Sequence, residues 1–462
     1  MRINWQEPKV VAVIMVLAIF LIGMFMGKIV TGFSYKVPLV LALSALIFII
    51  TLVNTDAGLA VLIFSMLLSP EIVIGEVPGR EIVIRFDDLM LIVITLAWLA
   101  KTAINKGLAL FIKTPLNKAI GVYILICLIA TLRGVALGYV IPEKGLFYVL
   151  RYVEYFLLYI LVANHIHSRK QIKFFLTAFF ITCAIVSVYG ILQIPTGERV
   201  SAPFEGQVGE PNTFGGYLLF IFCLAMGLSL KKVPKNIRLA LVGLIILISL
   251  PFIYTLSRGS YIAIIFSLIT FIILGKKKLL LTSATVLIIV LILVLKPEAF
   301  FSRVKYTFQE KESRLARIGD IYLDQSSSAR IFSWKDSFES WKKRPILGRG
   351  ISGFGLIDGQ YISTLPELGI IGLVAFIWLL LSILRHSYRI YKQMDDELYK
   401  GLSLGFIAGF IGLAIHALTA NTFIILRIME PFWFITAIIM MLPTLKEENL
   451  KYTVFKIEAS KA

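Results

Sequence analysis

Long, uninterrupted runs of apolar residues decide what this chain can fold into. Several runs reach the 18 or more residues that a helix needs to cross a bilayer. They are continuous rather than alternating, which argues against a membrane β-barrel. Of the 462 residues, 58% are hydrophobic and 16% charged, whereas soluble domains carry about 25% charged residues. The sequence therefore predicts an all-α polytopic membrane protein and excludes a soluble enzyme, a disordered chain and a coiled coil.

We predict twelve to fourteen transmembrane helices from these runs. The first run, Val10 to Gly27, is longer than the core of a cleavable signal, so we count it as a span. The predicted spans are 10–27, 37–53, 57–70, 88–104, 117–137, 146–163, 171–192, 212–230, 238–256, 260–275, 279–295, 367–385, 401–419 and 423–443.

The distribution of Lys and Arg predicts the topology. Short loops on one side hold most of the basic residues, which indicates that both termini are cytoplasmic. The net charge of +18 then fits loops that orient helices and contact anionic lipid, not nucleic acid. We predict four parts: transmembrane helices 1–11 over 1–295, a large extracytoplasmic loop over 296–366, C-terminal transmembrane helices over 367–445 and a cytoplasmic tail over 446–462.

The side chains that usually bind metals are badly placed for it here. Cys127, Cys183 and Cys223 all lie inside apolar runs, and the four histidines are scattered. The sequence has no phosphate-binding loop of the GxxxxGK[ST] type. We therefore predict no metal and no cofactor, and we expect the chemistry on the outer face, where the large loop lies.

Two outer arginines run against the charge bias. Arg199 precedes the loop SAPFEGQVGEPN, and Arg258 lies in the tight turn Ser257-Arg258-Gly259-Ser260. Arginine suits bidentate binding of phosphate near low-dielectric lipid. On sequence physics alone, snorkelling to lipid headgroups is the favoured alternative for each.

The large loop contains an amphipathic helix over 329–344. Ile331, Trp334, Phe338 and Trp341 fall on one predicted face, which suits a helix lying on the membrane surface. A helix that only covers the end of the bundle is an equally good interpretation.

Two carboxylates follow this helix. Asp358 is a candidate general base towards a sugar hydroxyl, with a turn or cap residue as the even alternative. Glu367, just after Pro366, more often serves as an N-terminal charge on the next helix.

Several other charged groups favour structural interpretations. The pairs Arg151–Glu154 and Arg427–Glu430, each at i and i+3, are self-neutralising within spans. His416 is typical of a packed histidine. The neighbours Asp87 and Asp88 fit a helix N-terminus better than a metal site.

Three segments, taken in order, resemble the O-antigen ligase and O-antigen polymerase superfamily. They are ERVSAPFEGQVGEPNTFGGYL (198–218), TLSRGSY (255–261), and the pair RPILGRGISGF (344–354) and DGQYISTLPELGIIGL (358–373). The resemblance covers roughly residues 145–440, and the first spans carry little of it. Each segment alone is weakly specific, but their order is more telling.

The resemblance implies a GT-C-like, metal-independent, inverting glycosyltransferase in a bacterial-type plasma membrane, with an extracytoplasmic active site. The donor would be a glycan on undecaprenyl pyrophosphate, and the acceptor a hydroxyl of a glycan, lipid or protein. A flippase or a chain-length regulator is implied as a partner by analogy only. Carried over residue by residue, Arg199 and Arg258 would bind the pyrophosphate, with Asp358 as the third catalytic candidate. The candidate substrate-binding residues are Arg330, Arg349, Tyr361, Asn212 and Glu367.

The sequence departs from the ligase pattern at one position. Asp358 stands where the ligases have a histidine, and residues 297–366 contain no histidine. The carboxylate, with an ordinary pKa of about 3.9, is a weaker base and alternatively orients the acceptor. This favours polymerase over ligase chemistry. A lipid-glycan flippase or secondary transporter, and a structural membrane protein, are the alternatives.

Overall fold

The computed structural model describes residues 36–69, 71–77, 80–104, 112–205, 209–275, 317–318, 321–322, 325–355 and 357–459. These residues are mostly helical, as predicted, and form two compact units, Met1–Ile112 and Lys113–Ala462. Twelve of the predicted spans correspond to helices. The spans 10–27 and 279–295 lie outside the described residues.

The described residues of unit 1 form three helices and a β-hairpin. The elements are α2 (Lys36–Val53), α3 (Thr55–Leu68), β1 (Glu71–Val77), β2 (Arg80–Arg85) and α4 (Phe86–Ile104). The strands are antiparallel, with Glu71 opposite Arg85 and an irregularity between Val73 and Gly75. The hairpin lies between two predicted spans and was not predicted.

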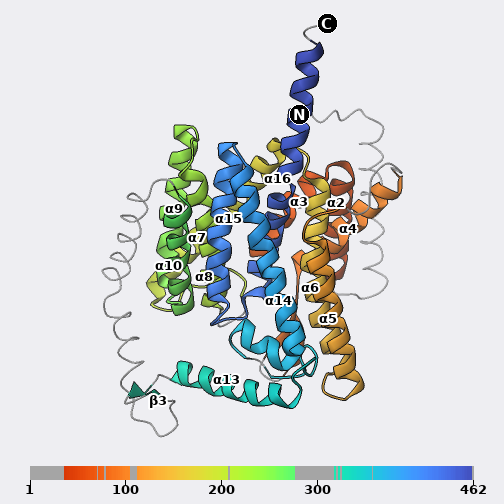
Figure 1. Cartoon of the computed structure of the whole chain (residues 1–462), viewed down its shortest axis with the longest axis vertical. Helices are drawn as coiled ribbons and strands as arrows, with labels where there is room; N and C mark the ends of the chain where they lie inside the picture. Colours follow the sequence, from red (N-terminus) through yellow and green to blue (C-terminus); the bar gives the residue numbers. More distant parts are fainter. Residues whose placement is uncertain are drawn as a thin grey trace. The chain divides into compact units, whose positions relative to one another are not determined.

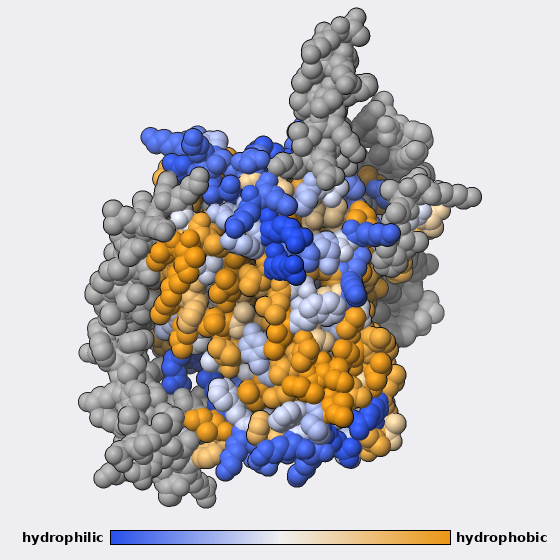
Figure 2. Space-filling model, in the orientation of Figure 1, coloured by the Kyte–Doolittle hydropathy of each residue, from blue (hydrophilic) through white to orange (hydrophobic). Residues whose placement is uncertain are grey.

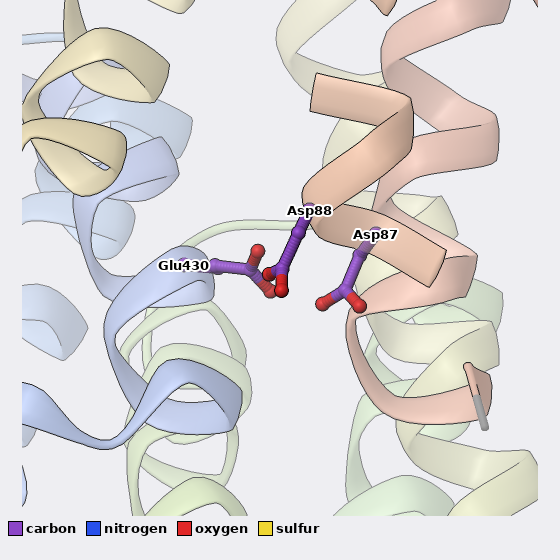
Figure 3. Close-up of side chains that lie close together, drawn as sticks. All are labelled: Asp87, Asp88 and Glu430. Carbon is purple, nitrogen blue, oxygen red and sulfur yellow. The ribbon is translucent and has the colours of Figure 1, made fainter. Parts of the chain in front are cut away.

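Asp87 and Asp88 organise the start of α4. Ser69 Oγ donates to Asp87 Oδ1 at 2.7 Å, and the buried Arg85 guanidinium pairs with the same carboxylate. Asp88 Oδ2 accepts the Arg85 backbone N–H at 2.9 Å. These contacts agree with a helix N-terminal role. Figure 3 labels both aspartates on α4 together with Glu430 of α16, which belongs to unit 2.

Unit 2 is a helical bundle with short additional elements. These are α5 (Asn117–Ala136), α6 (Pro142–His165), α7 (Arg169–Gln193), η1 (Ile194–Thr196), α8 (Pro211–Ser229), α9 (Lys235–Tyr254), α10 (Arg258–Leu274), β3 (Arg317–Ile318), β4 (Ile321–Tyr322), α13 (Gln325–Lys343), α14 (Gln360–Gln393), α15 (Glu397–His416), η2 (Thr422–Ile424) and α16 (Leu426–Ala459). Among the described residues, eight helices are long and apolar enough to cross a membrane, and α3 and α10 are shorter apolar helices. Figure 2 shows an apolar band between two hydrophilic ends, as a polytopic membrane protein requires.

The centre of unit 2 is formed by α8, α15 and α16. Of the apolar stretch of α8 and of α16, 89% is buried, against 28% for α9. Glycines allow α8 and α15 to touch through their backbones. A Cβ on Gly405 would lie 2.5 Å from the Cys223 carbonyl oxygen, and one on Gly227 would lie 2.5 Å from that of Gly401. Small residues spaced by four are typical of close helix crossings in membranes.

At one end of unit 2, α13 lies across the bundle and packs against α14 (Figure 1). The predicted apolar face is only partly correct. Ser337 and Ser340 are buried, whereas Phe338 is 47% exposed. The helix is held by Trp334 and Trp341 through indole N–H bonds to carbonyl oxygens, so its inner face is more polar than expected.

The helix α14 begins at Gln360 and breaks at Gly369, where φ is 67°. Only glycine fits there, because a Cβ would lie 2.2 Å from the Ile346 carbonyl oxygen. The break separates residues 360–368 from the long apolar part of α14. The loop after α13 therefore packs directly against the break in α14, at Ile346.

We predict that Gly405→Ala destabilises the protein by about 1–3 kcal/mol, because the added methyl group forces α8 and α15 apart. The matched control is Gly243→Ala on α9, where a Cβ meets no atom within 4 Å. That change should be neutral or slightly stabilising. Thermal unfolding in detergent measures both, and equal midpoints for the two variants would contradict the packing argument.

Candidate functional site

The resembling segments meet at the turn 416–420, which follows α15. A Cβ on Gly259 would lie 2.2 Å from Thr419 Oγ1, and one on Gly359 would lie 2.9 Å from the Leu418 carbonyl oxygen. Arg258 and Asp358 each directly precede one of these glycines. The turn therefore brings two segments separated by a hundred residues to neighbouring positions.

Arg199 is bound to both neighbouring segments. Its Nε donates to the Thr255 carbonyl oxygen at 2.9 Å, and its Nη2 donates to Asn212 Oδ1 at 3.2 Å. The Val200 N–H donates to the Tyr254 carbonyl oxygen at 3.1 Å. The half-buried guanidinium is thus held between the first turn of α8 and the α9–α10 turn that carries Arg258.

Arg258 is the first residue of α10, and its side chain is half-buried. Ser257 caps the helix by accepting the Ser260 N–H at 3.3 Å. Leu256 has a φ of 49°, which costs a non-glycine residue about 1–3 kcal/mol. The strained turn places Arg258 at the positive end of the helix dipole, an arrangement suited to anions.

Asp358 forms an ion pair with Arg330 of α13. The distance from Arg330 Nε to Asp358 Oδ2 is 3.1 Å, and the two side chains are 23% and 57% exposed. Trp334 Nε1 donates to the Asp358 carbonyl oxygen at 2.7 Å. Because one carboxylate oxygen is engaged by the guanidinium, the ion pair fixes the orientation of the carboxylate.

Gln360 and Tyr361 attach the start of α14 to α15 and its turn. The Gln360 N–H donates to the Ala417 carbonyl oxygen at 2.9 Å, and its side chain accepts the Phe423 N–H at 3.2 Å. The Tyr361 hydroxyl donates to the Ala414 carbonyl oxygen at 2.9 Å. Both side chains therefore fix the position of Asp358 relative to α15 and the turn that follows it.

Arg349 and Glu367 belong to a different cluster. The Arg349 guanidinium lies 5.6 Å from the centre of the Phe354 ring, and its backbone N–H donates to the Pro366 carbonyl oxygen. Glu367 accepts the Ser352 N–H at 3.0 Å. In the described parts of the chain, no contact links these two residues to Arg199 or Arg258.

Arg427 anchors the loop that follows Arg199. Its Nη atoms donate to the carbonyl oxygens of Pro203 and Phe204, each at 2.8 Å. Its Nε lies 3.6 Å from Glu205 Oε1, and both side chains are buried. Glu205 thus joins Arg427, a partner that the i, i+3 pattern with Glu430 did not indicate. The other predicted pair, Arg151–Glu154, is present at 3.1 Å.

His416 lies beneath the site and is 1% exposed. Its Nδ1 is 2.8 Å from Thr422 Oγ1. Its ring carbons would contact a Cβ on Gly216 or Gly259, at 3.4 and 3.5 Å. The histidine thus packs between α8 and α10, in agreement with the structural interpretation, and supports both arginine-bearing segments.

Residues that could hold a metal are few. Within the described part of unit 2 alone, no three side chains of His, Cys, Asp or Glu lie close enough to share an ion. The arrangement at the turn 416–420 instead offers two guanidinium groups beside a helix N-terminus, and a carboxylate on the adjoining segment. It is suited to an anion and to a hydroxyl group.

Some supporting residues could not be identified from the sequence. Thr255 and the turn 416–420 act through backbone oxygens, which carry no residue signature. The spacing of Gly401, Gly405 and Gly409 by four residues did carry a signal for the close crossing on which the turn depends.

A comparison with protein families gives a match over part of the chain. Residues 243–377 match the family model of O-antigen ligase. The match confirms the resemblance to the O-antigen ligase and polymerase superfamily, and supports glycan transfer of that general kind. It includes Arg258, Arg330 and Asp358, whereas Arg199 lies before it. No curated protein gives a significant sequence match to the chain.

We predict that Glu205 makes stability depend on pH. Burial raises the pKa of Glu205 to about 7, against the opposing effects of Arg427 and two backbone N–H groups. The folded state then binds a proton more tightly than the unfolded state does. Stability should fall by about 1–3 kcal/mol as the pH rises from about 4.5 to 7, and level off above.

Thermal unfolding between pH 4.5 and 8 measures this dependence. Glu205→Gln should flatten the decline, since the amide does not titrate. Glu198→Gln, on the exposed turn before Arg199, is the control and should leave the decline unchanged. An unaltered profile for Glu205→Gln would show that other groups cause it.

Proposed function

We propose that this protein transfers a glycan from an undecaprenyl-pyrophosphate donor to an acceptor hydroxyl, at the outer face of the plasma membrane. The observation that carries the proposal is the meeting of the Arg258 and Asp358 segments on one turn, with Arg199 bound to the first of them. Both segments lie within the part of the chain that matches O-antigen ligase.

The donor side consists of Arg199 and Arg258. Two guanidinium groups and the N-terminus of α10 suit the two phosphate groups of the donor. Charge develops on the pyrophosphate as its bond to the sugar breaks. Preorganised donors of this kind typically lower a barrier by about 3–4 kcal/mol each. Asn212 fixes Arg199 through its side-chain oxygen, at 3.2 Å.

The acceptor side consists of Asp358 and Arg330. The acceptor hydroxyl oxygen forms a bond to the anomeric carbon, and the bond from that carbon to the phosphate oxygen breaks. Undecaprenyl pyrophosphate leaves with the electron pair, and the hydroxyl proton passes to Asp358. Displacement from the opposite side inverts the anomeric centre without a metal. Arg330 orients the carboxylate at 3.1 Å.

Within this proposal, Tyr361 and Glu367 act at the substrate site indirectly. Tyr361 holds the segment around Asp358 onto α15, and Glu367 holds the loop after α13 at Ser352. Arg349 is left free to contact the glycan away from the reacting atoms. We favour polymerisation over ligation, because Asp358 stands where the ligases have a histidine.

We predict that Arg258→Ala and Asp358→Ala each lower transfer by at least 100-fold, while the protein remains folded. The control is Arg238→Ala at the opposite end of α9, where the side chain is exposed and bonds only the Lys231 carbonyl oxygen among the described residues. Transfer is measured with purified protein, lipid-linked glycan and acceptor. Unimpaired transfer in either site variant, at equal protein levels, would refute the assignment.

Asp358→Asn separates the two roles left open for the carboxylate. If Asp358 accepts the proton, the amide should be as inactive as alanine. If it only orients the acceptor, the amide should retain a substantial part of the activity. Glycan movement across the membrane by reconstituted protein, with no glycosidic bond formed, would favour the flippase or transporter alternative.

The lipid-linked glycans of a deletion strain distinguish polymerase from ligase. We expect single repeat units to accumulate and long chains to disappear. Long chains that accumulate on the lipid carrier without reaching their acceptor would identify a ligase instead. Mass spectrometry of the extracted lipid-linked pool gives the size distribution.

A further inference from the structure

Two arginines away from the reacting atoms contact Tyr139, in the turn between α5 and α6, and a third bonds the loop that carries them. The Arg344 guanidinium lies 4.4 Å from the centre of the Tyr139 ring and donates to its hydroxyl. The Arg349 guanidinium lies 5.8 Å from the same ring. Arg133 Nη1 donates to the Gly348 carbonyl oxygen at 3.3 Å. We call Arg133, Arg344, Arg349 and Tyr139 the arginine cluster.

Backbone packing fixes the arginine cluster. A Cβ on Gly134 would lie 2.0 Å from the Arg349 carbonyl oxygen, and one on Gly350 would lie 3.0 Å from that of Ala130. The Ile351 N–H donates to Thr131 Oγ1 at 3.2 Å. The loop after α13 is thereby locked onto α5, and the arginines cannot separate without breaking this contact.

The positive charge of the cluster is not neutralised by an ion pair within the described residues. None of its arginines is among the salt bridges found there. Glu367, whose carbonyl oxygen contacts the same loop, directs its carboxylate at the Ser352 N–H. Arg349 Nε has no hydrogen-bond partner in this part of the structure. Arg133 is exposed and the other two are half-buried, so an external anion has access.

The cluster lies at the same end of unit 2 as the proposed transfer site (Figure 1). Arg330 lies in the second turn of α13, and Arg344 directly follows its last residue. Fourteen residues of helix span about 21 Å at 1.5 Å per residue. Phe332 and Phe338 lie between them and are 45% and 47% exposed. A chain of several sugars that starts at Asp358 could therefore reach the arginines along α13.

We propose that the arginine cluster binds an acidic group, carboxylate or phosphate, on a saccharide chain held at the transfer site. Guanidinium groups bind both anions in a bidentate manner, and the Tyr139 ring contacts both Arg344 and Arg349. This inference rests on the proposed function and deepens it, since it assigns an acidic glycan as the substrate class. Arg133, Arg344 and Tyr139 act in binding, away from the reacting atoms.

Binding of defined saccharides tests the proposal without requiring transfer. Full-length protein in nanodiscs of neutral lipid is titrated with tetragalacturonate and, in parallel, with maltotetraose. We expect the acidic tetrasaccharide to bind at least tenfold more tightly. The triple variant Arg133→Gln/Arg344→Gln/Arg349→Gln should lose that preference.

The matched control removes the same charge from exposed positions of α13, as Lys335→Gln/Lys342→Gln/Lys343→Gln. It should keep at least a third of the affinity for tetragalacturonate. If both triple variants lose the same affinity for tetragalacturonate, the preference depends only on overall charge and the proposal is overturned. Equal affinity of the wild type for the two saccharides would overturn it as well.

Two further measurements separate the remaining explanations. If the cluster instead binds lipid headgroups, the wild type should retain more phosphatidylglycerol than the triple variant and should not bind tetragalacturonate. That result would overturn the proposal. Arg344→Lys keeps the charge and loses the planar stacking, so a several-fold weaker binding is expected even if the triple variant folds poorly. Acidic binding without any transfer activity would refute the proposed function and leave this binding site in place.

Discussion

Backbone contact between α8 and α15 is the constraint on which unit 2 depends. Gly405 and Gly227 let the two helices approach until only a hydrogen atom fits between them. This close approach fixes the position in space of the C-terminal end of α15, and therefore the position of the turn 416–420 relative to α10. Gly259 and Gly359, which come from two different segments, both pack against this turn. The position of the charged groups therefore follows from backbone packing between two apolar helices.

Much of the fold could be predicted from the sequence because membrane helices are coded locally. A run of apolar residues is sufficient to predict a span, and twelve predicted spans correspond to helices. The hairpin β1–β2 was not predicted, since it lies between two spans and has no apolar run of its own. The face of α13 was predicted only partly, because periodicity reports apolar residues and not the buried Ser337 and Ser340.

The candidate site could be predicted in its members but not in its geometry. Arg199, Arg258 and Asp358 were visible because arginine and aspartate are unusual next to apolar spans. Their supports were invisible, because Thr255 and Ala417 act through backbone oxygens that every residue has. The partner of Arg427 shows the same limit. Residue spacing does not reveal that Glu205 approaches this arginine from a distant loop.

The two sides of the proposed site are supported in different ways, and this sets an order of events. Arg199 is bonded to the α9–α10 turn and to the first turn of α8, and Arg258 is the first residue of α10. Asp358 is attached to α13 through Arg330 and is followed by Gly359, whose φ is 110°. In the proposed reaction, the two arginines that bind the donor would thus be in place before the donor arrives. In the proposed reaction, the acceptor would instead meet a carboxylate whose position depends on one contact with α13, so acceptor entry would be the step that discriminates between substrates.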